Sequence, residues 1–147
     1  MKEIAVKLTD LLKKGTRFVA NNTEEDLRFK ASTDIWSKKE TLGHLIDSGI
    51  YNLQRFSEIQ FENKPYKIRK YSQNELVKIN RYNDADSMEL LSFWLSINER
   101  ITQLIKVLDT DTLSYQIELD NGELSDLNFL IKDYVDHLEY HLKQIIN

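Results

Sequence analysis

The chain has 147 residues and no cysteine. The absence of cysteine excludes a disulfide framework, a thiolate metal site and a cysteine nucleophile. The length is typical of one domain with a conventional core, which residues 1–147 are expected to form. The net charge is −4, with basic residues scattered among acidic ones, which argues against a nucleic-acid partner. Because no secretory leader is visible and no apolar run approaches the ~20 residues needed to cross a bilayer, we expect a soluble, cytoplasmic protein with no membrane partner.

Apolar spacing predicts helices along most of the chain. Over residues 2–20, apolar side chains recur at the i, i+4, i+7 positions of one helical face. A second long helix is expected over residues 38–60, because Ser37 and Glu40 have the Ser-x-x-Glu spacing of a capping box and an apolar face follows them. A similar box predicts a short extra helix over residues 72–80.

The second half of the chain continues this pattern with one interruption. Residues 86–108 keep helical spacing, whereas residues 115–119 alternate polar and apolar positions before an Asp-Asn-Gly turn signal. A small hairpin-like excursion is therefore expected there, before a last helix that Ser125 can cap and whose apolar stripe continues to Ile145. These elements predict an all-α fold, a four-helix bundle, in which metal or ligand sites are commonly built from facing helices.

The three histidines of the chain fall in two places. His137 and His141 are four residues apart, so on a helix they project from one face and can hold one ion together. His44 could supply a third nitrogen, but it lies about 150° from the apolar stripe of its own helix. It shares that side with Glu40 and Asp47, and is either solvated or faces a cleft outside the main core. The C-terminal pair also has an electrostatic explanation, because protonated imidazoles interact favourably with the carbonyl groups at a helix end.

A longer pattern connects these two places. The sequence reads Trp-Ser-x-x-Glu-x-x-Gly-His-Leu-x-Asp over residues 36–47, Asn-Leu-Gln-Arg-Phe over 52–56, Asp-Asn-Gly-Glu over 120–123 and His-x-x-x-His-Leu-x-Gln-Ile over 137–145. In this order and spacing the chain resembles the DinB-like superfamily of small bundle proteins, in the branch of YfiT-like metal-dependent hydrolases and thiol-dependent S-transferases, not the DNA polymerase that shares the name. The resemblance covers most of the chain and implies a DinB/YfiT-like bundle. It places the divalent-metal ligands of the family on His44, His137 and His141.

The resemblance also implies a function. The expected protein is a metal-dependent enzyme of thiol S-transferase or hydrolase type, which acts on a small molecule and takes a low-molecular-weight thiol as a candidate partner. Three histidines leave a coordination position open, as in catalytic zinc sites. Zinc or nickel is the expected divalent ion, with iron, cobalt or manganese as alternatives that nitrogen ligands also accept. The alternative is a non-catalytic binding or stress-related bundle protein whose metal site is structural or inactive, and a homodimer is implied by the resemblance alone.

Carboxylates and other side chains near the histidines are candidates for supporting roles. Asp47 is the candidate catalytic carboxylate, with Asp133 as second choice, because either could accept an imidazole N–H or a proton from the nucleophile. Acidic residues on polar helix faces are also common without such a role. Arg55 is expected to be a solvated partner of neighbouring acids, with recognition of an anionic substrate as the alternative. Trp36 and Trp94 are expected in the core.

Overall fold

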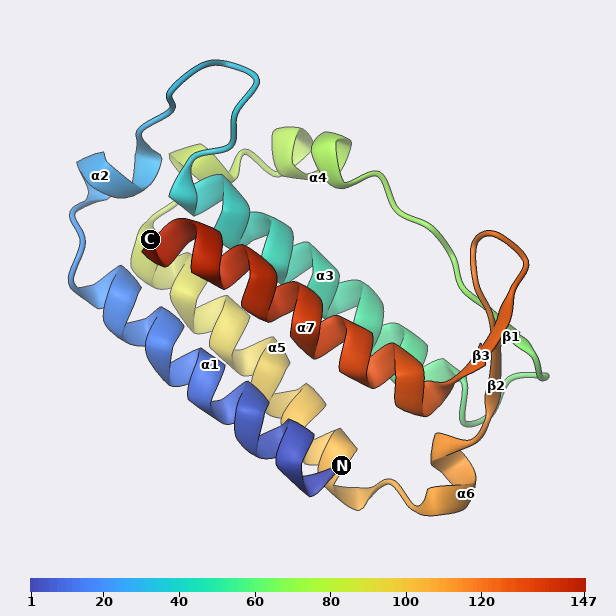
Figure 1. Cartoon of the computed structure of the whole chain (residues 1–147). Coiled ribbons are helices and arrows are strands. Elements are labelled where there is room, and N and C mark those ends of the chain that lie inside the picture. Colours follow the sequence, from blue (N-terminus) through green and yellow to red (C-terminus); the bar gives the residue numbers. More distant parts are fainter.

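Four long helices run side by side along the molecule (Figure 1). They are α1 (Lys2–Ala20), α3 (Lys38–Glu58), α5 (Ser87–Val107) and α7 (Leu127–Ile146). The computed structural model, which describes residues 1–147, confirms the predicted four-helix bundle. Both α1 and α3 pack against α5 and α7. The first two long helices of the chain therefore occupy opposite corners of the bundle.

A long connection returns the chain from the end of α3 to the start of α5. These two helices run in the same direction (Figure 1), so residues 59–86 have to travel back along the bundle, as the crossover connections of other bundles do. The connection contains β1 (Tyr66–Lys67), α4 (Gln73–Ile79) and a 3₁₀ turn, η1 (Tyr82–Asp84). Together with α2 (Glu24–Arg28), α4 and η1 pack on α3. The short helix α4 was predicted, whereas α2 and η1 were not.

The hairpin-like excursion before the last helix is part of a small sheet. Ile117 of β2 pairs with Ser125 of β3 in antiparallel register and with Tyr66 of β1 in parallel register. The pairing with β1 was not predicted, and it ties the start of the long connection to the hairpin. The connection from α5 to α7 contains α6 (Thr110–Leu113), β2 (Gln116–Glu118) and β3 (Leu124–Asp126).

Side-chain caps fix where three of the long helices, α3, α5 and α7, begin. The Oγ of Ser37 accepts a hydrogen bond of 3.0 Å from the backbone N–H of Glu40, as the capping box predicted. The predicted cap at Ser125 is wrong, because Ser125 pairs within β3. Asp126 takes that role, and its Oδ1 accepts a hydrogen bond of 2.8 Å from the backbone N–H of Phe129.

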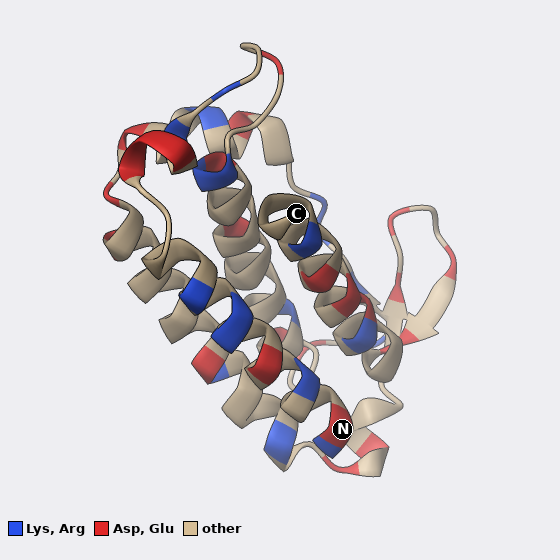
Figure 2. Ribbon diagram, turned by 60° about the vertical axis from the view of Figure 1, so that its left-hand side comes forward, with Lys and Arg blue, Asp and Glu red and all other residues tan.

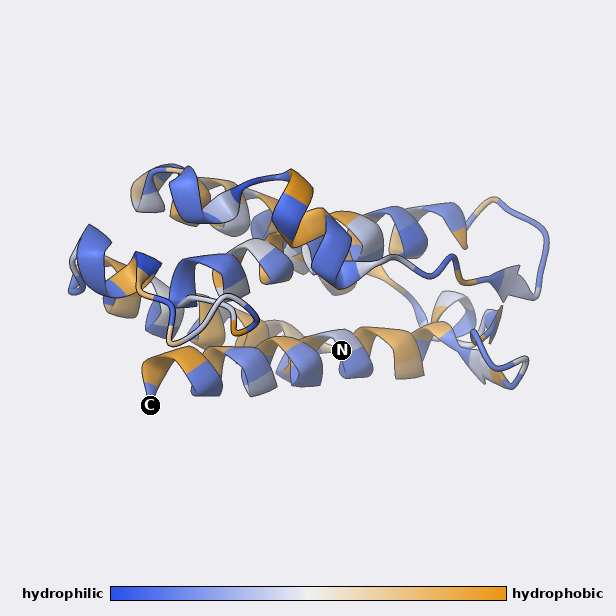
Figure 3. Ribbon diagram, turned by 90° about the horizontal axis from the view of Figure 1, so that it is seen from above, coloured by the Kyte–Doolittle hydropathy of each residue, from blue (hydrophilic) through white to orange (hydrophobic).

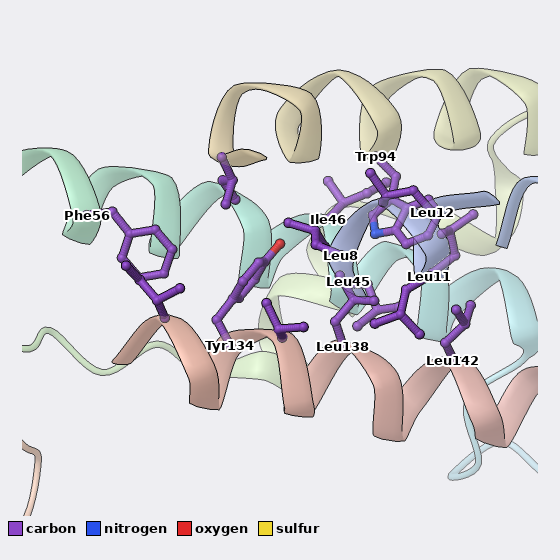
Figure 4. Close-up of a cluster of buried hydrophobic side chains, with 14 of the residues drawn as sticks. Leu8, Leu11, Leu12, Leu45, Ile46, Phe56, Trp94, Tyr134, Leu138 and Leu142 are labelled. Carbon is purple, nitrogen blue, oxygen red and sulfur yellow. The ribbon is translucent and has the colours of Figure 1, made fainter. Parts of the chain in front are cut away.

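The core lies between the four long helices, each of which carries apolar residues along one side (Figure 3). Leu8, Leu45, Trp94 and Leu138 come from α1, α3, α5 and α7, and all four are fully or almost fully buried (Figure 4). Gly15 allows α1 to approach the Trp94 ring, because a Cβ at this position would lie 2.6 Å from two ring carbons. The expectation that Trp94 belongs to the core is thus confirmed.

The polar side of α3 is buried as well as its apolar side. Glu40, His44, Asp47 and Ser48 are all buried, because α2, α4 and η1 pack on α3 in addition to the bundle helices. The alternative that His44 is solvated is therefore wrong, since its side chain is 0% exposed. Its helix instead presents a polar face inside the protein.

Charged residues of both signs are distributed over the helices and loops (Figure 2). Ion pairs join some of them between helices, such as Lys7 of α1 with Asp136 and Glu139 of α7. No helix is both long enough and apolar enough to pass through a membrane.

Candidate metal centre

The structure brings the three histidines of the chain together between α3 and α7. His44 lies in the second turn of α3, and His137 and His141 occupy successive turns of α7. One ring nitrogen from each lies within 4.8 Å of the other two, and the Nε2 atoms of His44 and His137 are 3.2 Å apart. Nitrogens bound to one tetrahedral ion at about 2.0–2.1 Å would be roughly 3.4 Å apart. The donor set therefore fits a three-nitrogen metal site.

Burial favours the neutral form of these imidazoles. Burial and the two neighbouring imidazoles lower the pKa of His44 to about 3. Burial and the proximity of His141 lower the pKa of His137 to about 4, and burial also lowers the pKa of His141. At neutral pH the rings are uncharged and their lone pairs can bind an ion. The electrostatic explanation of the C-terminal pair needs protonated rings, so it does not describe this arrangement.

A hydrogen bond orients one of the three rings. The Nδ1 of His141 lies 2.9 Å from the Oε1 of Gln144, and an Nδ1–H that donates to this oxygen leaves Nε2 free as a ligand. Sequence reasoning did not assign a role to Gln144, although the residue is part of the C-terminal motif. The Nδ1 of His44 is buried and has no hydrogen-bond partner.

Aromatic rings border the cluster, and one of them, Trp36, also lines two cavities. The Trp36 ring centroid lies 4.9 Å from that of His44 and 6.5 Å from that of His141. Trp36 is only partly buried, so the expectation of a purely core residue was incomplete. It lines cavities of about 690 Å³ and about 550 Å³, and Gln144 lines the second one too. Tyr140, which is 59% exposed, packs edge-on against His141.

The candidate carboxylate Asp47 is held by a tyrosine and not by an imidazole. Its Oδ1 accepts a hydrogen bond of 2.5 Å from the hydroxyl of Tyr82, and its buried Oδ2 has no partner. Burial raises the pKa of Asp47, and the Tyr82 hydrogen bond opposes that shift. Of the two roles considered for Asp47, acceptance of an N–H from His44 is not observed, because Nδ1 of that ring has no hydrogen-bond partner. Asp133 is exposed on α7, one turn before His137.

Arg55 does not form the ion pair that was expected of it. No carboxylate lies within 4.0 Å of its guanidinium. Its Nη2 instead donates a hydrogen bond of 2.6 Å to the backbone carbonyl of Arg69, in the long connection. The guanidinium carbon also lies 5.6 Å from the centroid of the Tyr71 ring. This contact was not predicted, because it forms only when the long connection returns over α3.

The family of the chain follows from its sequence. A model of the DinB superfamily matches residues 9–145, which is nearly the whole length. The chain belongs to the DinB superfamily. A search among curated protein sequences found no match.

Two solved structures share the fold of this chain. YfiT from Bacillus subtilis superposes on this chain with a TM-score of 0.87 at 22% sequence identity, over 98% of this chain and 82% of that one. It is described as a probable metal-dependent hydrolase with an unusual four-helix bundle topology. A mycothiol-dependent maleylpyruvate isomerase gives a TM-score of 0.74 at 12% identity, over 98% of this chain and 60% of that one. This DinB-superfamily chain thus spans about three-fifths of the isomerase. At these identities the likeness concerns the fold.

Proposed function

We propose that this DinB-superfamily protein is a metal-dependent enzyme that acts on a small molecule by thiol transfer or by hydrolysis. His44, His137 and His141 are the proposed ligands of one divalent ion. The observation that carries the proposal is the convergence of three imidazole nitrogens from two helices within 4.8 Å. Both reaction classes have support from the relatives, since one is described as a probable metal-dependent hydrolase and the other as mycothiol-dependent.

Zinc and nickel are the ions we propose, with iron, cobalt and manganese as further candidates that nitrogen ligands accept. When bound, such an ion lowers the pKa of a thiol or water at its open position and polarises the oxygen of an electrophile. The protein keeps the three imidazoles neutral by burial. Gln144 fixes the orientation of His141. Trp36 packs near His44 and His141 and also lines two cavities, which are the proposed approach for a small molecule.

We also propose that Asp47 accepts the proton released by the thiol or water. It is buried and is three residues from His44, and burial raises its pKa, which makes the carboxylate a better proton acceptor than a solvated one. Tyr82 holds one oxygen of the carboxylate in place, and the other has no protein partner. An Asp47→Asn variant should therefore keep its metal while losing turnover about 100-fold or more. Turnover equal to that of the wild type would remove Asp47 from the mechanism.

A two-substrate screen tests the enzyme class. Protein reconstituted with zinc or nickel would be assayed for loss of thiol in the presence of a reactive aryl halide, and separately for hydrolysis of an activated ester. We expect turnover in one assay that a chelator abolishes and that fresh metal restores, and no turnover by His137→Ala. A wild type that binds a full equivalent of metal yet shows no metal-dependent turnover in either assay would instead support the non-catalytic alternative.

A further inference from the structure

A polar and aromatic cluster continues the face of α3 that carries His44. Ser48, Tyr51 and Arg55 follow His44 by 4, 7 and 11 residues, so all four positions lie within roughly 60° of one another around the helix. Tyr71, from the long connection, lies over this face. Its ring stacks on that of Tyr51 with centroids 4.4 Å apart, and the Arg55 guanidinium carbon lies 5.6 Å from the centroid of the Tyr71 ring.

The positive charge of Arg55 has no counter-ion in this cluster. One of its terminal nitrogens, Nη2, is occupied by the Arg69 carbonyl at 2.6 Å. The other, Nη1, is 3.5 Å from the Oδ1 of Asn52, which is at the outer limit of a hydrogen bond. The Nε is buried and has no partner. A partly buried cation without an anion is unfavourable, so the cluster has the chemistry of an incomplete anion site.

We propose that Arg55, together with Tyr51 and Tyr71, binds the carboxylate of a substrate or thiol whose reactive atom lies at the histidine cluster. The inference rests on the proposed function and specifies its substrate class. A guanidinium suits a carboxylate because its planar N–H groups match the two oxygens. The ligand is thus a small organic acid, not a neutral molecule.

The helix geometry limits the length of this acid. The Cα atoms of His44 and Arg55 are separated by about 16 Å along α3. Side chains on a helix lean toward its N-terminus, and the contact of Arg55 with Asn52, three residues earlier, agrees with that direction. The guanidinium therefore lies closer to the histidines than its Cα does. A separation of roughly 10 Å between the reactive atom and the carboxylate is expected, as in a short acyl chain or a small peptide.

Arg55 could also serve only to brace the long connection through the Arg69 carbonyl and the Tyr71 ring. Both roles predict a loss of stability when Arg55 is replaced, but only a carboxylate site predicts discrimination between an acid and its neutral amide. Asp133 offers a second distinction. It lies near enough to interact electrostatically with Arg55 without forming an ion pair, so it should compete with the carboxylate of a ligand.

The test compares 6-mercaptohexanoate with its amide, titrated into cobalt-loaded protein and followed by the thiolate absorption band. Wild type should bind the acid at least about ten-fold more tightly than the amide, as expected for a charge-assisted hydrogen-bonded pair. Arg55→Gln should lose this preference. Arg100→Gln, which removes the same charge from an exposed position on α5, should keep it. Asp133→Asn should strengthen binding of the acid about two- to five-fold and leave the amide unchanged.

The outcomes separate this inference from the proposed function. Equal affinity of the wild type for acid and amide would overturn the carboxylate site but leave the metal-dependent enzyme intact. An Arg55→Gln protein that melts at a lower temperature yet keeps the preference would show that Arg55 is only a brace. If that variant does not fold, Arg55→Lys decides, because it keeps the charge without the planar fork and should show a reduced preference. A wild type that binds no metal would overturn both proposals.

Discussion

Replacement of Gly43 by alanine should destabilise the protein, although alanine favours helices. Gly43 precedes His44 on α3, and the Tyr82 ring packs directly over it. A Cβ on residue 43 would lie 2.1 and 2.2 Å from the Cδ2 and Cγ atoms of Tyr82, so the ring would have to move. That movement would break the hydrogen bond from the Tyr82 hydroxyl to Asp47, which is 2.5 Å long.

Two destabilising effects and one stabilising effect set the size of this change in the free energy of unfolding. Overpacking of a buried site costs about 1–3 kcal/mol, and loss of a buried hydrogen bond to a charged group costs about 1.5–3 kcal/mol. The higher helix propensity of alanine offsets about 1 kcal/mol of this loss. The free energy of unfolding of Gly43→Ala should therefore be lower than that of the wild type by about 1.5–5 kcal/mol.

Urea unfolding followed by circular dichroism measures this difference. Gly49→Ala is the matched control, because its Cβ would meet one methyl carbon, the Cγ2 of Ile97, at 2.8 Å, which is a smaller overlap than the two ring atoms at 2.1 and 2.2 Å that Gly43→Ala would meet. The control should lose less stability than Gly43→Ala, because the overlap is smaller and the hydrogen bond between Tyr82 and Asp47 stays intact. A Gly43→Ala protein as stable as the wild type, or more stable, would refute the packing of Tyr82 on α3.

Three further predictions concern stability and metal affinity. The folded-state pKa values of His44 and His137, about 3 and about 4, lie below the ordinary value of 6.5, so the unfolded state binds more protons between these limits. The free energy of unfolding of the metal-free protein should then fall as the pH drops from 6.5 toward 4, and a constant urea midpoint over that range would contradict this. Glu24→Gln removes the carboxylate partner of the buried Lys39 ammonium and should cost about 1 kcal/mol, a discounted value because Glu24 is half exposed; an unchanged urea midpoint would argue against the pair. Gln144→Ala should weaken zinc binding about 10- to 100-fold in a competition titration with a chromogenic chelator, whereas wild-type affinity would mean that Gln144 does not orient His141.

The sequence predicted the long helices well because each carries its own periodic signal. The expected helix over residues 2–20 is α1 (Lys2–Ala20), and the capping box at Ser37 marks the start of α3. Elements that form only by pairing with a distant segment of the chain have no such periodic signal in the sequence. The strand β1 has only two residues, Tyr66 and Lys67, and it exists because β2 lies beside it.

The histidine cluster could be predicted from the sequence, whereas the surroundings of its residues could not. The spacing of His137 and His141 and the resemblance together pointed to the cluster that the structure brings together. The position of His44 on a polar helix face left its burial open, because the rings that pack against it include those of His137 and His141, on a helix far along the chain. The surroundings of Arg55 were misjudged for the same reason, since Tyr71 reaches it only through the long connection.

Elemental analysis of protein purified without a histidine tag tests the central claim most directly. The wild type, reconstituted with zinc or nickel and freed of excess metal, should retain about one ion per chain. His44→Ala and His137→Ala should lose it while keeping a helical circular dichroism spectrum, and Tyr140→Phe, an exposed neighbour of His141, should retain it. A folded wild type that takes up neither metal, or histidine variants that bind a full equivalent, would contradict the three-histidine centre.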